Sequence, residues 1–271
     1  MTSEHPDSFT LLPGAHESPV ILHVPHSSRA IPDAVRAGIV LDDEALEREL
    51  DHITDSHTAR LAAAAAERAA VRPWQFVNEL SRLVVDPERF PDEREEMAAV
   101  GMGAVYTRTT QGGTLRESVD PQPLISRYFH PYARSMTAAV ADRLAATGRA
   151  VVIDVHSYPS RRLPYELHGD GPRPPICLGT DEFHTPSRLL TAAREAFAHC
   201  GGIEVNTPFA GAYVPLDFYG KDARVGGLMV EIRRDLYLEE PGGPAGPGLI
   251  TLASALAALV DVWTPGQRAG H

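Results

Sequence analysis

The sequence predicts an α/β fold in which helices cover both faces of a mostly parallel, twisted sheet. Short apolar runs rich in β-branched residues alternate with longer Ala- and Leu-rich runs of helical spacing. No internal repeat or long linker divides the chain. Strands that alternate with helices form parallel pairs, and the helices pack on the faces of the sheet. We therefore expect one domain over residues 1–271, with ligands bound at the carboxyl ends of the strands.

Each predicted element is bounded by capping or turn residues. The expected strands are Val20–Val24, Leu83–Val85, Ala150–Val155, Ile176–Leu178 and Leu228–Ile232. The expected helices are Asp43–Leu50, Thr54–Ala70, Ile125–Ala146, Pro186–His199 and Leu249–Val262. A polar N-terminal segment of about residues 1–12 and a frayed tail of about residues 264–271 flank them.

Composition excludes several classes of function. A net charge of −11 argues against a nucleic-acid partner, since no basic field displaces phosphate counterions. Two cysteines, Cys177 and Cys200, form neither a disulfide framework nor a multi-cysteine zinc site, and we expect both to be buried. No signal pattern or membrane span is evident. We expect a cytoplasmic protein with no nucleic-acid or membrane partner.

Two histidines follow predicted strands. His26 comes after the first strand in His-Val-Pro-His-Ser-Ser-Arg, and His156 ends the run Val-Val-Ile-Asp-Val-His. A single histidine at such a position is more often a loop residue, but two at one sheet edge favour a metal site. His23 is interpreted as structural. Asp154 shares a strand face with His156, so it could fix the tautomer of that histidine, act as a further ligand or form a turn.

A carboxylate ligand is expected between the two histidines. Asp51 and Asp55 are four residues apart, so a helix through both would place them on one face. Asp55 could instead cap a helix. Catalytic zinc sites commonly take three histidine or carboxylate ligands and leave one position for water. His26, His156 and one of these aspartates meet that requirement.

Further candidates surround this expected site. Glu231 lies within an apolar strand, where a carboxylate is costly unless it is paired or functional. It could form an ion pair with Arg233 or act as a general base. Arg82 and Arg89 flank the run 83–85, and Arg82 is the better candidate for binding a substrate anion. Glycine-rich stretches at 100–103 and 111–113 suggest a mobile substrate loop rather than a nucleotide site.

From Val20 to Tyr237 the chain resembles the N-formylglutamate amidohydrolase family. The matching segments are Val-Pro-His-Ser at 24–27, the Asp-rich stretch through Asp55, Ser-Arg-Leu-Val-Val-Asp at 81–86, Pro-Tyr at 131–132, Asp-Val-His-Ser at 154–157 and Val-Glu-Ile-Arg at 230–233. The resemblance implies a three-layer fold with a mixed sheet, related to the zinc carboxypeptidases, and one zinc ion per chain.

Carried over by position, the resemblance also implies roles for individual residues. His26, His156 and Asp55, with Asp51 as the alternative aspartate, correspond to metal ligands. Glu231 corresponds to the catalytic glutamate. Arg82 corresponds to a substrate contact, and Arg89 and Arg233 are further substrate-binding candidates.

The expected reaction is zinc-dependent hydrolysis of an N-acyl amino acid, here N-formyl-L-glutamate, to formate and L-glutamate. Glu88 stands where the family pattern has asparagine, and Ala133 where histidine is frequent. Glu88 would weaken the attraction for a dicarboxylate. A related metallohydrolase acting on another N-acylated or peptide-like acid is therefore an alternative, and a catalytically silent binding protein is a second. The oligomeric state stays open.

Overall fold

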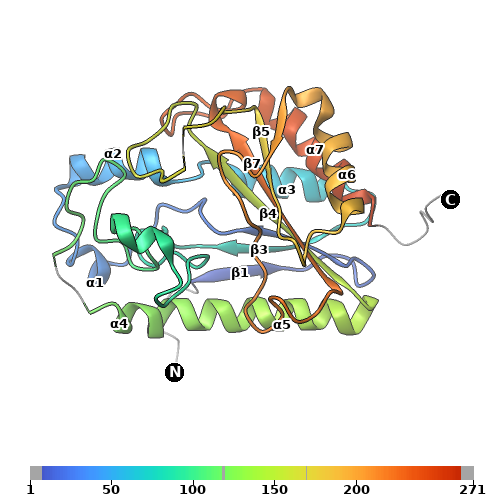
Figure 1. Ribbon diagram of the computed structural model, residues 1–271, viewed down its shortest axis with the longest axis horizontal. Coiled ribbons are helices and arrows are strands. Elements are labelled where there is room, and N and C mark those ends of the chain that lie inside the picture. Colours follow the sequence, from blue (N-terminus) through green and yellow to red (C-terminus); the bar gives the residue numbers. More distant parts are fainter. Residues whose placement is uncertain (1–7, 118–119, 169, 264–271) are drawn as a thin grey trace.

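The computed structural model describes residues 8–117, 120–168 and 170–263, which form a seven-stranded sheet with helices on both faces (Figure 1). The strands are β1 (Phe9–Leu12), β2 (Val20–Val24), β3 (Trp74–Asn78), β4 (Ala150–Tyr158), β5 (Ile176–Gly179), β6 (Ile203–Val205) and β7 (Val225–Arg233). The main helices are α1 (Asp33–Arg36), α2 (Asp43–Ile53), α3 (Thr58–Arg68), α4 (Gln122–Leu124), α5 (His130–Thr147), α6 (Ser187–Phe197) and α7 (Gly248–Asp261). Residues 1–7 of the expected N-terminal segment and the tail from residue 264 lie outside the described residues.

The order of the strands is β1-β3-β2-β4-β7-β5-β6. The four strands β3, β2, β4 and β7 are parallel, whereas β1 and β5 pair antiparallel with β3 and β7. The prediction of a mixed, mostly parallel sheet is therefore confirmed. Because β2, β4 and β7 are parallel neighbours, their carboxyl ends meet at one edge of the sheet.

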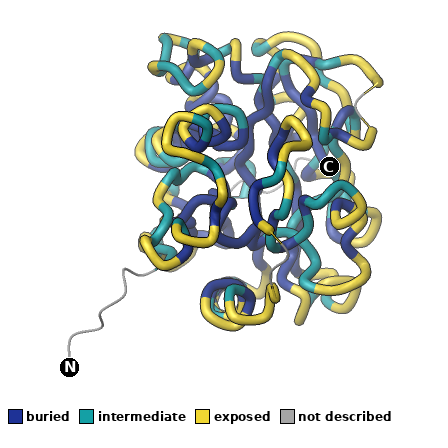
Figure 2. Tube along the Cα trace, turned by 90° about the vertical axis from the view of Figure 1, so that its left-hand side faces the viewer, coloured by how far each residue is buried: buried dark blue, intermediate teal, exposed yellow. Residues whose placement is uncertain are grey.

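The two faces of the sheet have different coverings. Helices α3, α6 and α7 pack on one face and α5 on the other (Figure 1). On β4, Ile153 and Val155 belong to the first core, whereas Val152 belongs to the core beneath α5. Strand alternation therefore places Asp154 and His156 on the α5 side. Figure 2 shows the buried trace along the centre of the molecule and the exposed trace along its outer loops.

One predicted strand is wrong. Leu83–Val85 is buried but forms a turn, and the strand of this region is β3. The Ser81 hydroxyl accepts a hydrogen bond from the Leu83 amide, and the Ser81 carbonyl accepts one from the Val84 amide. These local bonds satisfy backbone groups that a strand would have paired with a neighbour.

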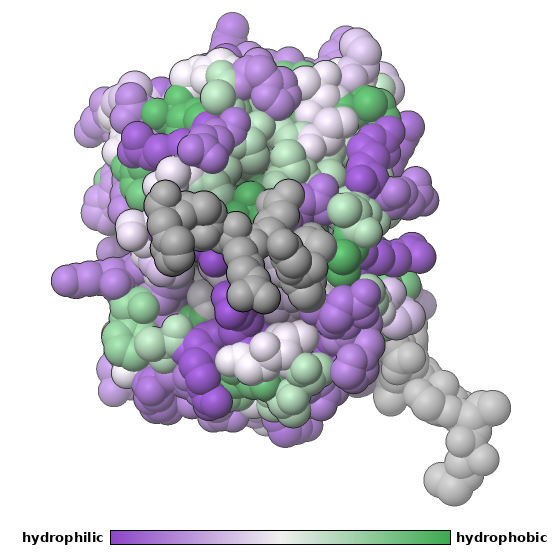
Figure 3. Space-filling view, turned by 90° about the vertical axis from the view of Figure 1, so that its right-hand side faces the viewer, coloured by the Kyte–Doolittle hydropathy of each residue, from purple (hydrophilic) through white to green (hydrophobic). Residues whose placement is uncertain are grey.

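Surface and cysteine features complete the description. None of the helices in the described part of the chain has both the length and the apolar character needed to cross a membrane. The face drawn in Figure 3 mixes hydrophilic residues with small, separated hydrophobic patches, as on most folded domains.

Both cysteines are free; Cys177 is buried as expected, but Cys200 is only half-buried.

Candidate metal centre and active site

Three predicted residues converge at the carboxyl edge of the sheet. His26 follows β2 and His156 lies near the end of β4, and their Nδ1 atoms are 3.2 Å apart. Asp55 Oδ2 lies 3.1 Å from the Nδ1 of His156 and 3.8 Å from that of His26. All three side chains are buried. The carboxyl ends of two neighbouring parallel strands thus bring together residues that 130 positions of sequence separate.

The break between helices α2 and α3 positions Asp55 next to the two histidines. Helix α2 ends at Ile53, and α3 begins only at Thr58 after a left-handed residue, His57 (φ 69°). The sequence allowed either a helix through Asp51 and Asp55 or Asp55 as a helix cap. Neither forms, because α2 ends before Asp55 and no side chain caps α3. The Asp55 amide donates to the carbonyl of His26 at 3.0 Å, which holds the turn against the strand exit. Asp51 remains on α2, where it forms an ion pair with Arg29 at 2.7 Å.

Carboxylates surround the far nitrogens of both histidines. His26 Nε2 lies 2.9 Å from Asp86 Oδ1. His156 Nε2 lies 3.0 Å from Asp154 Oδ2 and 3.1 Å from Glu88 Oε2. The hydrogen bond from Nε2 of His26 to Asp86 leaves a lone pair on Nδ1 of that ring. The two carboxylates beside Nε2 of His156 are near it without forming a hydrogen bond, and they favour a proton on Nε2 and a lone pair on its Nδ1. Two lone pairs and one carboxylate oxygen then face one another.

Such a set of three acceptors fits a cation. Tetrahedral zinc with bonds of about 2.0–2.1 Å places its ligand atoms roughly 3.3 Å apart. The three separations of 3.2, 3.1 and 3.8 Å bracket that value. His26, Asp55 and His156 therefore have ligand atoms and spacing that are compatible with a bound metal ion.

The electrostatic environment favours positive charge at this point. Burial opposes protonation of His156, but Asp154 and Glu88 outweigh it and raise the pKa of this histidine well above its ordinary value. Burial also disfavours the ionised form of Asp55, which would raise its pKa. Hydrogen bonds from His156 and His26 outweigh this effect and hold the pKa of the carboxyl below its ordinary value. The cluster thus stabilises positive charge, which a metal ion would supply in place of protons.

Glu231 lies beside the candidate ligands. It pairs in register with His156 across β4 and β7, and its side chain is buried. Its Oε2 atom has no hydrogen-bond partner among the described residues. Burial is the main cause that raises the pKa of Glu231 to about 7. A carboxylate of this kind suits proton transfer near neutral pH.

Of the two roles considered for Glu231, the ion pair with Arg233 does not form. Arg233 donates to Asp235 at 2.8 Å and to the carbonyl of Arg173. The arginine that reaches the centre is Arg234, which is buried and donates to Asp55 Oδ1 at 3.0 Å. Sequence analysis missed Arg234, because nothing in the pair Arg233-Arg234 distinguishes the two.

Arg82 and Arg89 have different surroundings. Arg82 donates to Asp86 Oδ2 at 2.7 Å and to the Tyr106 hydroxyl at 2.9 Å, and Tyr106 itself donates to Asp86. Since Asp86 also contacts His26, Arg82 is part of the support for a candidate ligand. The nearest carboxylate oxygens to Arg89 lie 3.6 and 3.7 Å away, and its buried Nε has no hydrogen-bond partner. Arg89 therefore retains donors for another group.

Arg89 lines a cavity of about 600 Å³ beside the cluster. Glu88 and Asp154 form the wall nearest the histidines, and α5 contributes a second wall that includes Ala133. Both positions that depart from the family pattern, Glu88 and Ala133, thus face this one cavity. Its volume lies within the range typical of small-molecule sites.

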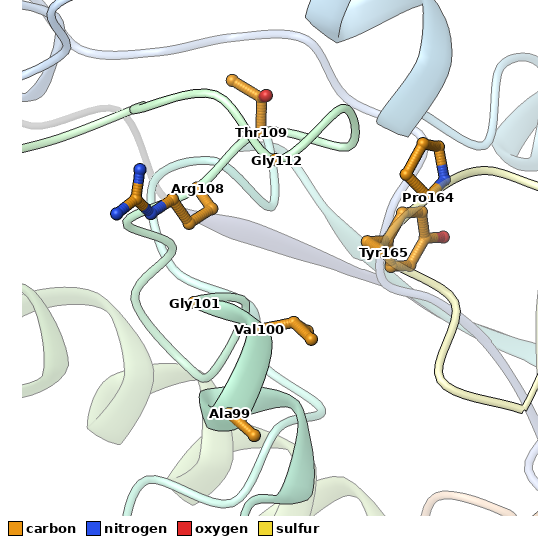
Figure 4. A pocket seen from close by; sticks show the side chains of 8 residues that line it. All are labelled: Ala99, Val100, Gly101, Arg108, Thr109, Gly112, Pro164 and Tyr165. Atoms are coloured by element: carbon orange, nitrogen blue, oxygen red, sulfur yellow. The ribbon is translucent and has the colours of Figure 1, made fainter.

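A second cavity of about 350 Å³ lies at the loop that carries the glycine-rich stretches. Figure 4 shows Tyr165 and Pro164 on one side, with Ala99 to Gly101 and the Arg108–Gly112 stretch around the others. Thr110 of this loop donates from its amide and hydroxyl to buried Glu49, at 2.7 and 2.8 Å. The loop that was expected to be mobile is therefore hydrogen-bonded to α2, and the contact with Glu49 was not predicted from the sequence.

Known proteins resemble this chain over most of its length. A family model for N-formylglutamate amidohydrolase matches residues 18–238. The chain is 27% identical over 233 residues to N-formylglutamate deformylase from Pseudomonas aeruginosa, covering 82% of this chain and 83% of the relative. It is 26% identical over 239 residues to the deformylase from Pseudomonas putida, covering 82% of each.

Solved structures show the same fold. The crystal structure of an N-formylglutamate amidohydrolase from Ralstonia eutropha aligns with a TM-score of 0.77 at 23% identity, covering 94% of this chain and 96% of that one. A protein from Agrobacterium tumefaciens aligns with a TM-score of 0.65 at 19% identity, covering 93% of each chain.

Proposed function

The chain belongs to the N-formylglutamate amidohydrolase family, and from this premise we propose that it hydrolyses N-formyl-L-glutamate to formate and L-glutamate with the help of a bound zinc ion. The names of the Pseudomonas relatives support this substrate. The convergence of two imidazole nitrogens and a carboxylate, with an unpartnered glutamate beside them, is the observation that carries the proposal.

His26, Asp55 and His156 would hold the metal. Zinc in such a site supplies Lewis-acid chemistry, polarising the amide carbonyl and making a nearby water easier to deprotonate. Asp86 accepts from Nε2 of His26, and Asp154 lies 3.0 Å from Nε2 of His156. Both carboxylates favour the tautomer in which Nδ1 is free to bind the metal. Arg234 donates to the other oxygen of Asp55 and so directs Oδ2 toward the histidines.

Glu231 acts as the general base and then as the general acid. It takes a proton from the attacking water and returns it to the nitrogen of the leaving amino acid. A pKa of about 7 leaves a substantial ionised fraction near neutral pH and still allows the protonated form to donate. Its position opposite His156 on the neighbouring strand keeps it next to the candidate ligands.

Arg89 binds a carboxylate of the substrate. Its unpartnered donors and its place in the 600 Å³ cavity suit this role better than those of Arg82, which Asp86 and Tyr106 already engage. A planar guanidinium binds a carboxylate through two parallel hydrogen bonds. Arg233 has no part in the proposal, because Asp235 engages its side chain.

The test combines metal analysis with a substrate panel. Purified protein should contain zinc and release formate from N-formylglutamate, and His26→Ala should lose the ion of this centre together with formate release. Hydrolysis of a different N-acylated acid, with none of N-formylglutamate, would point to the related metallohydrolase. Zinc binding without hydrolysis of any member of the panel would point to a silent binding protein.

A further inference from the structure

Two carboxylates lie on the opposite side of His156 from the candidate metal centre. Glu88 and Asp154 each direct one oxygen toward His156 Nε2, at 3.1 and 3.0 Å. Each directs its other oxygen toward Nδ1 of His23, at 3.5 Å for Glu88 and 2.8 Å for Asp154. The ring of His156 therefore separates two clusters. Its Nδ1 faces Asp55, and its Nε2 faces this carboxylate pair.

The atoms that face one another in the second cluster lack hydrogen-bond partners among the described residues. They are His23 Nδ1, Glu88 Oε1 and Asp154 Oδ1, which all lie within 4.8 Å of one another. His23 and Asp154 are fully or almost fully buried. His23 Nδ1 and Asp154 Oδ1 are 2.8 Å apart, close enough for an ion pair, but neither atom takes part in a hydrogen bond. Three buried polar atoms thus lie close together without hydrogen bonds.

Two buried carboxylates at this separation need positive charge near them, and His156 lies against only one oxygen of each. Each loses hydration, and each repels the other. The opposite nitrogen of His23, Nε2, lies 2.6 Å from the Tyr132 hydroxyl. A proton held on Nε2 for that contact leaves a lone pair on Nδ1, which adds a third acceptor to the cluster.

We propose that His23, Glu88 and Asp154 form a second site, which binds a divalent transition-metal ion. One imidazole and two carboxylates are a ligand set suited to Mn²⁺, Fe²⁺ or Zn²⁺. Glu88 and Asp154 also line the 600 Å³ cavity, so water or a ligand in that cavity can complete the coordination. The ion neutralises the carboxylate pair.

The second site also accounts for the charge of the cavity. Six acidic and three arginine side chains line it, a net formal charge of −3. A divalent ion at its inner wall changes the balance to −1 and offers a direct contact for a carboxylate. If the substrate is the dicarboxylate of the proposed function, this ion explains how an acidic cavity accepts it.

The experiment counts metal ions on the whole chain, independently of activity. Metal-free protein is dialysed against rising Zn²⁺, and separately against Mn²⁺, and bound metal per chain is measured by elemental analysis. Wild type should reach two ions with at least one of the two metals. His26→Ala should lose the first ion and keep the second, whereas His23→Ala should lose the second and keep the first. Circular dichroism checks that each variant is folded.

Two further variants sharpen the result. Glu88→Gln preserves volume and should reduce binding to one ion. Asp217→Asn removes an acid from the same cavity outside the cluster and should leave two. The second site would be refuted if wild type saturates at one ion or none with both metals. It would also be refuted if folded His23→Ala and Glu88→Gln both retain two ions. The proposed function fails by a different outcome, the absence of N-formylglutamate hydrolysis.

Discussion

Replacing Glu231 with glutamine separates a catalytic base from a structural carboxylate. The change keeps the volume and removes the proton acceptor. If Glu231 moves the proton, the variant should retain zinc and lose roughly 10²–10⁴-fold in kcat, with little change in KM. Formate release and elemental analysis measure the two effects on one preparation.

The same change should stabilise the metal-free protein at alkaline pH. Burial raises the pKa of Glu231 from 4.5 to about 7. Because the pKa of Glu231 is higher in the folded than in the unfolded protein, its ionisation does not destabilise the folded state below pH 4.5. The destabilisation grows as the pH rises to about 7. At 1.36 kcal/mol per pH unit, this interval corresponds to about 3 kcal/mol. Glu231→Gln should therefore be more stable than wild type by about 3 kcal/mol at pH 8, and similar to it at pH 4.5.

A buried glutamate with a partner supplies the control. Glu166 accepts from Arg173 at 2.6 Å, so Glu166→Gln should destabilise the protein by roughly 3–5 kcal/mol at pH 8. Urea denaturation in the presence of a chelator measures all three proteins. If Glu231→Gln behaves like Glu166→Gln and its folded fraction stays active, Glu231 is structural and the proposed mechanism is wrong.

Three other predictions address the metal, the anion contact and the loop. His156→Ala, or treatment with a chelator, should remove zinc and formate release together, and added zinc should restore only wild type. Arg89→Ala should raise KM for N-formylglutamate roughly tenfold or more, the loss expected for a charged hydrogen-bonded pair. Arg82→Ala should instead lower kcat to the same extent for acidic and for neutral substrates. A loss of activity confined to acidic substrates would show that Arg82, and not Arg89, binds the substrate carboxylate. Glu49→Ala leaves two Thr110 donors without an acceptor and should cost about 1–3 kcal/mol by urea denaturation, so an unchanged midpoint would refute this role.

The site residues that could be predicted best from the sequence are those whose position follows from the order and direction of the strands. His26 and His156 could be brought together in advance because the carboxyl ends of parallel strands meet at one edge. Glu231 stood out because a carboxylate is rare in an apolar strand. Both signals depend on backbone pattern, which is local in sequence.

Residues placed by tertiary contact gave no comparable signal. β3 was missed because Gln75 and Asn78 interrupt its short apolar run, although Asn78 donates to the carbonyl of Pro25 and so supports the strand exit. Arg234 reaches Asp55 only through the turn that follows β7. His23 was interpreted as structural, and burial does not distinguish that role from contact with Asp154. A break between two helices was predicted near this point, but the hydrogen bond from the Asp55 amide to the His26 carbonyl, which positions Asp55, was not.

The turn between α2 and α3 has a consequence for how this protein responds to its metal supply. Asp55 is 101 residues from His156, so an ion bound by both ties the first helices to the middle of the sheet. Metal binding therefore adds to the free energy of folding, by about 4 kcal/mol at a free metal concentration 1,000 times the Kd. Without metal the turn is still held by long-range hydrogen bonds, in which Arg234 donates to Asp55 and Tyr237 donates to the Ser56 carbonyl. Loss of the metal should therefore raise amide exchange at residues 54–57 before it does so in the central strands.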